Sequence, residues 1–340
     1  MQSGIYKSVF LMFLVSGTFM VINASTWFNA WAGLELNMLS FIPLMIRDEE
    51  ILSAEAGLKY FLIQTIASLI LITVILKSSI LFNLLKGWGS VETWGVGGAL
   101  GLKLGMAPLH FWLPSLAKDL SWSNLMILLV WQKIAPLKLM SGIDFKDWIL
   151  GGLIISCIWV GGVGGFSQTS LAKLMSYSSI THMGWIGAAF KLDGEKWVLY
   201  FGVYSLLVLS MMWVFQREGC YILSHLWLNC SMSLIMKITL FVGLLSMGGL
   251  PPLLGFFPKW MVIEMLINVG DWKLGIYMAL GSLITLFYYF RMGFVIFMHF
   301  NSNPNVNIYF KEGGKLKNNF GWIFLGLNLV GLGYCGIVGL

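Results

Sequence analysis

The stretch GLKLGMAPLHFWLP, residues 101–114, decides how the rest of this chain is interpreted. It places prolines, glycines and a lysine inside a segment that is otherwise apolar enough to cross a bilayer. The stretch GGLPPLLGFFPKW, residues 248–260, repeats the pattern G-x-x-P-x-x-x-x-x-P, which begins at Gly105 in the first stretch and at Gly249 in the second. Matching interruptions in two halves of a chain are typical of transport proteins built from a duplicated unit.

The composition predicts an all-α integral membrane protein. Of 340 residues, 58% are hydrophobic and 11% are charged, and the mean hydropathy is +0.82. Globular chains carry about 25% charged residues, and a membrane-spanning helix needs about 20 mostly apolar residues. About eleven spans meet this criterion, the ninth of them interrupted: 5–23, 26–46, 57–78, 91–117, 122–141, 147–166, 171–190, 196–216, 232–268, 273–299 and 320–339. The short connections leave no room for a soluble domain.

Sequence patterns of cofactor and metal sites are missing. The four cysteines stand singly, which argues against an iron–sulfur or zinc site and favours packing roles. The glycines at 95–101 lack the spacing of a dinucleotide fingerprint and lie in a predicted span. The net charge of +6 is spread over loops, so nucleic-acid binding is not expected. We predict no redox centre and no metal site in this chain.

The distribution of loop charges predicts an orientation. With eleven spans the termini lie on opposite sides. The N-terminal side then carries nine loop Lys and Arg residues and the other side seven, so the positive-inside rule favours an N-terminus on the inner side. The first span follows Lys7 without a small-residue cleavage site, and we expect it to be a retained helix.

Ionisable residues at membrane depth are the candidate functional residues, because they are costly there. Glu35 lies near the middle of the second span. A buried carboxylate either takes a proton or finds a cation. The alternative is a neutral Glu35 that hydrogen-bonds a neighbouring helix.

Lys103 lies in the middle of the fourth span. Pro108 and Pro114 cannot donate to the carbonyls of Leu104 and His110, and free carbonyls at this depth must face protein or water. We therefore expect Lys103 and these carbonyls to share a hydrated cavity. The alternative is a lysine that extends to the headgroup region.

Three glycines of the same span are spaced four residues apart. Gly97, Gly101 and Gly105 fall on one helix face, which predicts a close approach by another helix. Lys103 is displaced from Gly101 and Gly105 by about 200° around the helix. We therefore expect Lys103 to point away from this glycine face.

Three further residues complete the candidate set. Lys133 follows Gln132 in mid-span, and Lys259 follows the second interruption directly. Lys259 beside Trp260 also fits a membrane interface. His182 lies in a span rich in hydroxyls, where it is either a proton relay or a hydrogen-bonded core residue.

These segments resemble the antiporter-like membrane subunits of respiratory complex I, and most closely the shortened form of animal mitochondria. The resemblance covers essentially the whole chain. It is carried by Lys103 to Pro114, by Lys173 to Gly184, by Ser246 to Trp260, and by Glu35.

The resemblance implies two inverted five-helix units, each with a broken helix. These units are 1–145 and 146–300, followed by a loop and a C-terminal helix over 301–340. By motif, Glu35 and Lys103 form a coupled pair, and Lys133 is the lysine that connects the two units. Lys259 is the lysine of the second broken helix, and His182 lines the polar axis between the units. The second half has no intramembrane carboxylate as clear as Glu35, which argues against an independent second channel.

The implied function is proton translocation across the mitochondrial inner membrane, as part of an NADH:ubiquinone reductase complex. NADH, FMN, iron–sulfur clusters and ubiquinone would be bound by other subunits. The expected partners are other membrane-arm subunits, including neighbouring antiporter-like ones, and lipids. Two alternatives stay open: a freestanding cation/proton antiporter, whose intramembrane residues would look the same, and a scaffold whose lysines are inert.

Overall fold

The computed structural model describes residues 2–46, 51–81, 90–143, 145, 147–192, 195–228 and 232–297, and six residues within 321–328. Over this part the chain is helical, with an isolated bridge between Ser170 and Ile222 and no strand. Five described helices are long and apolar enough to cross a membrane. They contain Ile5–Ile22, Ile51–Ser78, Trp148–Phe166, Lys196–Glu218 and Trp272–Phe297. The predicted all-α membrane class is confirmed, while most of the predicted last span lies outside the described residues.

The helices lie close to the predicted spans. In chain order they are α1 (Gln2–Ile22), α2 (Trp27–Met45), α3 (Ile51–Leu81), α4 (Ser90–Leu104), α5 (Trp112–Ala117), α6 (Trp122–Met126), the π-helix η1 (Ile127–Trp131), α7 (Gln132–Ser141), α8 (Asp147–Phe166), α9 (Leu171–Leu192), α10 (Lys196–Glu218), α11 (Leu223–Leu228), α12 (Leu234–Gly248), α13 (Phe256–Val269) and α14 (Trp272–Phe297). The chain divides into two compact units, Met1–Leu153 and Ile154–Leu340.

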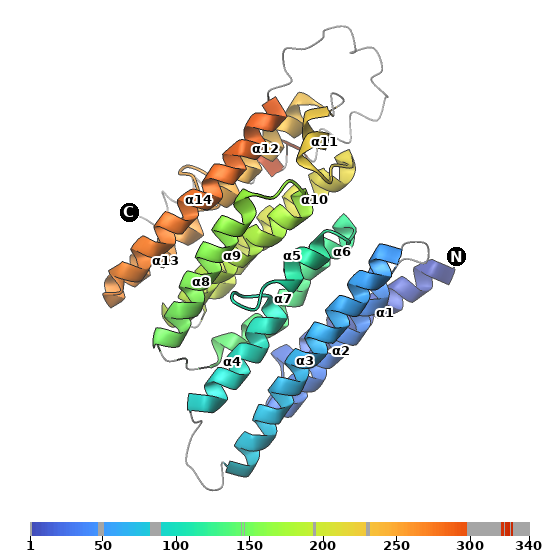
Figure 1. Ribbon diagram of the computed structural model, residues 1–340, viewed down its shortest axis with the longest axis vertical. Coiled ribbons are helices and arrows are strands. Elements are labelled where there is room, and N and C mark those ends of the chain that lie inside the picture. The colour runs from blue at the N-terminus through green and yellow to red at the C-terminus, as the bar shows by residue number, and fades with distance from the viewer. Residues whose placement is uncertain are drawn as a thin grey trace. The chain divides into compact units, whose positions relative to one another are not determined.

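In the first unit the long helices lie side by side (Figure 1). α1 packs on α2, α2 on α3, α3 on α4, and α4 on α7. Two glycines bring α1 and α2 together, because a Cβ on Gly17 would lie 3.0 Å from the carbonyl oxygen of Gly33. Small residues that allow such close approach are the usual helix contacts in membranes.

No other helix in the described part of the chain covers the centre of the predicted glycine face of α4. A Cβ placed on Gly101 would meet no described atom within 4 Å. The close contact between α3 and α4 is made instead at Gly95, where a Cβ would lie 2.5 Å from Cγ2 of Val74. The spacing of four identifies a face of small residues, but it does not say whether another helix of the chain lies on that face.

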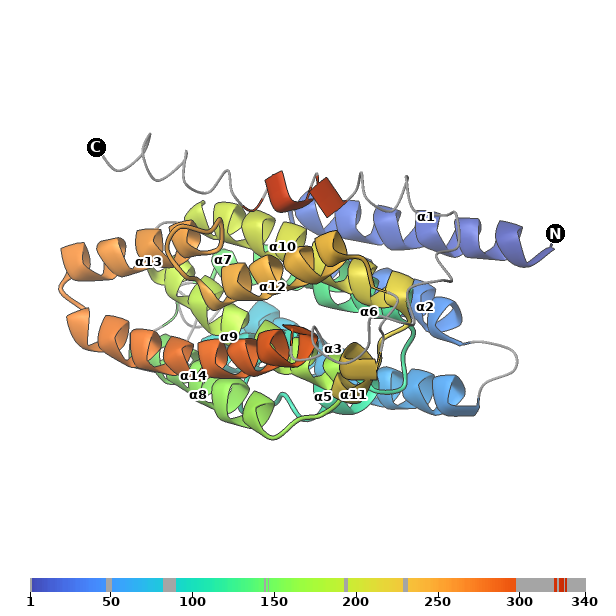
Figure 2. The ribbon, with the colours of Figure 1, turned by 90° about the horizontal axis from the view of Figure 1, so that it is seen from above.

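The second unit buries polar side chains and exposes apolar ones. α12 packs against α10 and α14, and α9 against α10 and α13 (Figure 2). Its buried polar residues include Ser176, Ser178, Ser179, Thr181 and His182 of α9. Large apolar residues of α14, among them Leu283 and Phe287, are exposed. This distribution is expected where lipid surrounds the helices, because polar groups there must find partners inside the protein.

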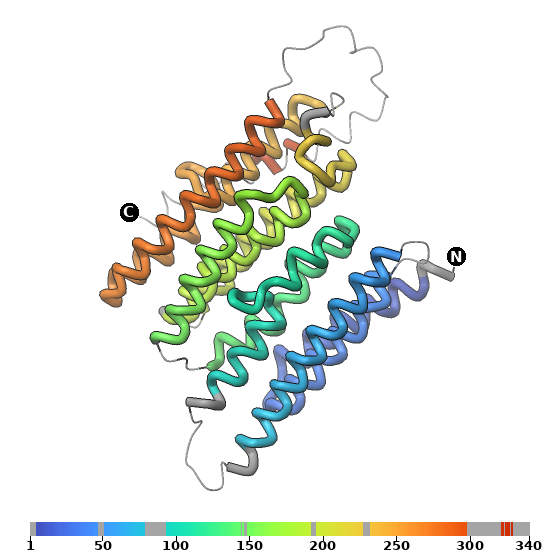
Figure 3. The backbone as a smooth tube through the Cα atoms, viewed as in Figure 1, coloured from blue at the N-terminus to red at the C-terminus, as the bar shows by residue number. Residues whose placement is uncertain are grey.

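Both proline-containing stretches interrupt a helix, as predicted (Figure 3). The first break separates α4 from α5, and the second separates α12 from α13. Gly105 and Gly249 begin the two breaks with φ angles of +70° and +80°, a left-handed conformation that favours glycine. Cis peptide bonds precede Pro108 and Pro252. The two stretches thus share backbone geometry at matched positions.

Candidate functional site

The first break is held by a tryptophan side chain. The carbonyl oxygen of Leu102, in the last turn of α4, accepts hydrogen bonds from the Gly105 amide at 3.1 Å and from Trp112 Nε1 at 3.0 Å. The carbonyl of His110 was expected to be free, but it accepts from the Leu113 amide at 3.0 Å. A tight turn replaces the helical donor that Pro114 cannot supply, so this part of the prediction is wrong.

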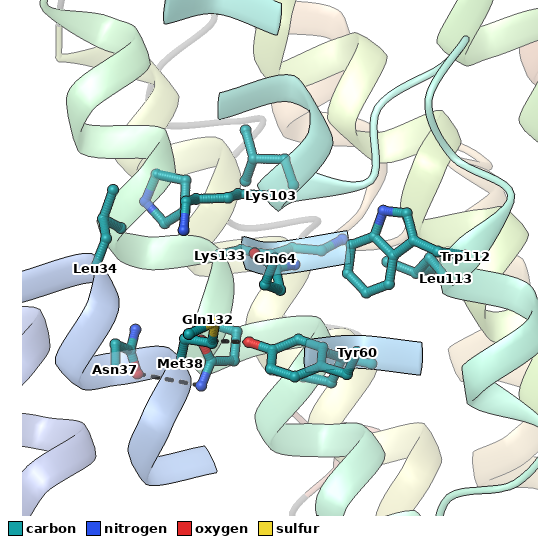
Figure 4. Close-up of a pocket in the computed structure, with 13 residues that line it drawn as sticks. Leu34, Asn37, Met38, Tyr60, Gln64, Lys103, Trp112, Leu113, Gln132 and Lys133 are labelled. Carbon is teal, nitrogen blue, oxygen red and sulfur yellow. Dashed lines mark hydrogen bonds between the residues drawn. The ribbon is translucent and has the colours of Figure 1, made fainter. Parts of the chain in front are cut away.

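Lys103 and Lys133 line one cavity of the first unit (Figure 4). Both side chains are buried, Lys103 with 8% and Lys133 with 2% of its surface exposed. The cavity has a volume of about 20 Å³, which is enough for a water molecule. The structure therefore confirms that Lys103 faces a cavity and does not extend to a headgroup.

The other polar groups of this cavity are neutral. Asn37, Tyr60, Gln64 and Gln132 share its lining, and no carboxylate is found among the described residues that form it. Two ammonium groups in one small buried cavity repel each other. A state in which only one of the two lysines is protonated is thus electrostatically less costly than a state in which both are protonated.

Gln132 is fixed beside Lys133 by hydrogen bonds. Its Nε2 donates to Oδ1 of Asn37 at 3.1 Å, and its Oε1 accepts from the Tyr60 hydroxyl at 3.5 Å (Figure 4). The π-helical turn η1 directly precedes Gln132, and Pro136 follows in the next turn. π-turns inside helices are frequent at functional sites. Here the turn sets the position of Gln132 and Lys133 on the cavity wall.

Glu35 is close to this cavity but is not among the residues that line it. Its side chain is half-buried on α2, and Oε2 is buried without a hydrogen-bond partner among the described residues. Lys103 interacts electrostatically with Glu35, although the described residues show no direct ion pair between them. The structure thus brings the predicted pair into the same neighbourhood without joining them.

Lys259 closes the end of a helix in the second unit. Its ammonium donates to the carbonyl oxygens of Gly248 at 2.8 Å and Met247 at 3.1 Å, in the last turn of α12. It also lies 5.7 Å from the ring centre of Trp185. The side chain is 6% exposed, so Lys259 is buried inside the unit. A cation at this position is favoured by the negative end of the helix dipole.

His182 lies in a cluster of aromatic hydroxyls. Its Nδ1 is 3.1 Å from the Tyr200 hydroxyl, and its ring centre is 5.1 Å from that of Tyr204. Trp185, which contacts Lys259, follows His182 by one turn of α9. The histidine is therefore both hydrogen-bonded and close to the Lys259 region.

Comparison with known proteins decides the family. The family described as NADH:quinone oxidoreductase/Mrp antiporter, TM, matches residues 24–285. NADH-ubiquinone oxidoreductase chain 2 of Anopheles gambiae is 40% identical over 318 residues, which cover 93% of this chain and 91% of the relative. This chain belongs to the NADH-ubiquinone oxidoreductase chain 2 family.

Solved structures of low identity share the fold of this chain 2 family member. A chain in the structure of respiratory complex I from Thermus thermophilus with bound Aureothin has a TM-score of 0.84 at 21% identity, covering 98% of this chain and 79% of that chain. A chain of the Mrp complex from Dietzia sp. DQ12-45-1b has a TM-score of 0.75 at 16% identity, covering 85% of this chain and 60% of that one.

Sequence reasoning missed several polar residues of this chain 2 site. Asn37 and Gln64 are neutral amides inside apolar spans, the same signal that identified Glu35, and they could have been found by it. Tyr60 and Tyr200 gave no such signal, because tyrosine is common in apolar segments. Among the described residues no group of three or more His, Cys, Asp or Glu gathers as a metal site.

Proposed function

We propose that this chain is a proton-translocating membrane subunit of a respiratory NADH:ubiquinone oxidoreductase. Membership of the chain 2 family supports the assignment, as do the two matched helix breaks. The observation that carries it is the cavity shared by Lys103 and Lys133. Two lysines beside neutral amides and a water-sized space can exchange a proton, whereas an inert scaffold has no use for two buried lysines at this depth.

In the proposed mechanism Glu35 acts as the switch for Lys103. When Glu35 is ionised, it favours a proton on Lys103. When Glu35 takes a proton or moves, Lys103 releases its own proton through water to Lys133. Asn37 and Tyr60 hold Gln132, and so keep the adjoining Lys133 at the cavity.

The proton then continues to Lys259, with His182 as a relay. Lys259 is anchored on two carbonyls at a helix end, so a change in the second break would change its environment directly. We propose that the two breaks are the elements that respond to the redox reaction, because a coupled step needs an element with two arrangements.

The remaining assignments follow from the same proposal. The chain spans the mitochondrial inner membrane about eleven times, with its N-terminus on the matrix side. It forms two inverted five-helix units, 1–145 and 146–300, followed by 301–340. Its partners are other membrane-arm subunits and lipids. NADH, FMN, iron–sulfur clusters and ubiquinone are held by those other subunits, and this chain contributes proton transfer.

A freestanding cation/proton antiporter is the second candidate, favoured by the family description, which includes Mrp antiporters. Native gel electrophoresis of a mild-detergent extract separates the two. We expect this chain to migrate with NADH dehydrogenase activity in a large complex. Migration as a separate species near 38.1 kDa, without that activity, would overturn the proposal in favour of the antiporter.

A further inference from the structure

The break between α12 and α13 takes one backbone hydrogen bond from a distant part of the chain. Most amides of residues 249–256 donate to acceptors in α12 or in the break itself, among them that of Gly255, which donates to Oγ of Ser246 at 3.2 Å. The Leu254 amide instead donates to the carbonyl oxygen of Asn328 at 3.2 Å. Amides at membrane depth must find their acceptors inside the protein. The hydrogen bonds of the break are therefore complete only when Asn328 is in place.

A helical stretch at the end of the described residues lies along α12. We call the described residues of 321–328 the C-terminal segment. It contacts α12 at Gly321, where a Cβ would lie 3.0 Å from Cγ2 of Ile235. It contacts α10 through Phe324, whose ring centre lies 5.8 Å from that of Trp213. The C-terminal segment therefore runs from the beginning of α12 toward the break at the other end of this helix (Figure 2).

Asn328 is buried and anchored within the C-terminal segment. Its side chain is 4% exposed, and its Nδ2 donates to the carbonyl oxygen of Phe324 at 2.9 Å, one turn earlier. A buried amide is costly unless it is hydrogen-bonded. This bond fixes the end of the C-terminal segment, and so fixes the carbonyl that accepts from Leu254.

Leu254 lies between the two parts of the Lys259 anchor. The carbonyls of Met247 and Gly248, which accept from the Lys259 ammonium, lie in the last turn of α12, whereas Lys259 itself lies in the first turn of α13. The turn that contains Leu254 connects the two helices, so its position sets the distance from the ammonium to both carbonyls. The fit is close, since a Cβ on Gly249 would lie 2.7 Å from Cδ of Lys259. A shift of this turn therefore changes the surroundings of the lysine directly.

We propose that Asn328 is a positioning residue for Lys259, and that the C-terminal segment is a strap that holds the second break in its observed geometry. Asn328 acts through the Leu254 amide and the turn, and it carries no proton itself. Its effect on pumping rests on the proposed function, which assigns a proton step to Lys259. The strap itself does not depend on that function.

Two glycines of the C-terminal segment form a matched pair for the test. Gly321→Val places a side chain against Ile235 and should lift the strap from α12. Gly326→Val is the control, because Gly326 is exposed and a Cβ there would meet no described atom within 4 Å. Both variants are measured in the purified complex containing this chain, reconstituted in vesicles.

Hydrogen–deuterium exchange, measured by mass spectrometry, reports the break directly. We expect Gly321→Val to raise the exchange rate of the Leu254 amide by about tenfold or more, because exchange follows local opening. Proton pumping should fall by about tenfold or more, as for a displaced functional group. Gly326→Val should leave both unchanged. Unchanged exchange in Gly321→Val, or equal changes in the two variants, would overturn the proposal.

A compensating substitution separates positioning from a general loss of structure. Ile235→Ala removes the atoms that the valine side chain at position 321 would meet. Combined with Gly321→Val, it should restore slow exchange at Leu254 and pumping together. Failure of this double variant to restore either one contradicts the role of the strap.

The parent complex and a second variant keep the test decisive if Gly321→Val does not assemble. In the parent, the Leu254 amide should exchange as slowly as the Gly249 amide, whose acceptors lie in α12. Asn328→Leu removes the anchor on Phe324 and should speed exchange at Leu254. Fast exchange at Leu254 in the parent overturns the proposal, as does unchanged exchange in Asn328→Leu.

Lys103→Met, measured in parallel, distinguishes failure of this inference from failure of the proposed function. Full pumping in Lys103→Met would defeat the function and leave the exchange results to decide the strap. Reduced pumping in Lys103→Met, with parent-like exchange and pumping in Gly321→Val, would defeat only the strap.

Discussion

At the scale of single residues, the three buried lysines have different surroundings. Lys259 is held by two backbone carbonyls, so its charge also closes the end of α12. In the first unit the indole of Trp112 donates to α4 instead, and this leaves Lys103 to the cavity that it shares with Lys133. We infer that Lys103 and Lys133 exchange protons through this cavity, whereas Lys259 combines a structural with a chemical role.

Replacing Lys103 with Met should remove proton transfer without unfolding the unit. Because Lys103 forms no direct ion pair among the described residues, an apolar side chain of similar length removes the cost of burying its charge. We expect normal assembly on a native gel and a fall in proton pumping of about 10²-fold or more. Lys77→Met, a change at an exposed lysine of α3, serves as the control and should pump normally. An assembled Lys103→Met complex with full pumping would refute the assignment.

The coupling between Glu35 and Lys103 is open to a double-mutant cycle. Residues of one network show interaction energies of about 0.5–3 kcal/mol. Because the two side chains form no direct ion pair, we expect a value in the lower part of this range. The measurement compares the pumping rates of Glu35→Gln, Lys103→Met and the double variant. Strictly additive losses would mean that the two residues act independently.

At the scale of helices, two helices approach each other closely only at glycines that lie in their contact. α1 and α2 meet at Gly17 and Gly33, and α3 and α4 meet at Gly95. In the second unit a Cβ on Gly255 would lie 1.8 Å from the carbonyl oxygen of Ser246. The second break therefore requires glycine at position 255, because no side chain fits there, as well as its prolines.

The two glycines of α4 form a matched pair for a test of this packing. Gly95→Ala should lower the free energy of unfolding by about 1–3 kcal/mol, the usual cost of overpacking. The added Cβ would lie 2.5 Å from Cγ2 of Val74. Gly101→Ala should be neutral or raise stability by about 0.5–1 kcal/mol, since alanine suits a helix better than glycine. Thermal unfolding of the purified complex measures both. Equal losses in the two variants would show that a partner also covers Gly101.

At the scale of the whole molecule, lysines at opposite ends of the helices can be used to determine which end faces the matrix. Lys7 lies in the second turn of α1 and Lys77 near the end of α3. Three predicted spans separate them, so we expect them to reach opposite membrane surfaces. Both side chains are exposed. They are suited to a membrane-impermeant reagent that modifies amines.

We expect the reagent to modify Lys7 from the matrix side and Lys77 from the opposite side. The prediction rests on the excess of positive loop charges on the N-terminal side. Mass spectrometry of peptides from mitoplasts and from inverted membrane vesicles measures the two modifications separately. The reverse pattern would place the N-terminus outside the matrix and invert the direction of every proposed proton step.

The sequence by itself determined the class of the molecule, the approximate positions of its helices and the identity of the charged residues. Apolar length alone predicts helices in a bilayer, because the backbone must satisfy its hydrogen bonds internally. The positions of Pro108 and Pro252 likewise determined where two helices break. Lys103 and Lys133 could be named from sequence, since a charge in an apolar span is costly wherever it points.

Only the tertiary structure decided which of these residues meet. It brought Lys103 and Lys133 to one cavity, left Glu35 outside the lining, and moved the helix contact from Gly101 to Gly95. The π-turn before Gln132 and the carbonyls that hold Lys259 also come from packing. Spacing along a helix fixes the face on which a residue lies. Which residue contacts that face depends on how helices distant in the sequence pack together, and the local sequence does not determine this packing.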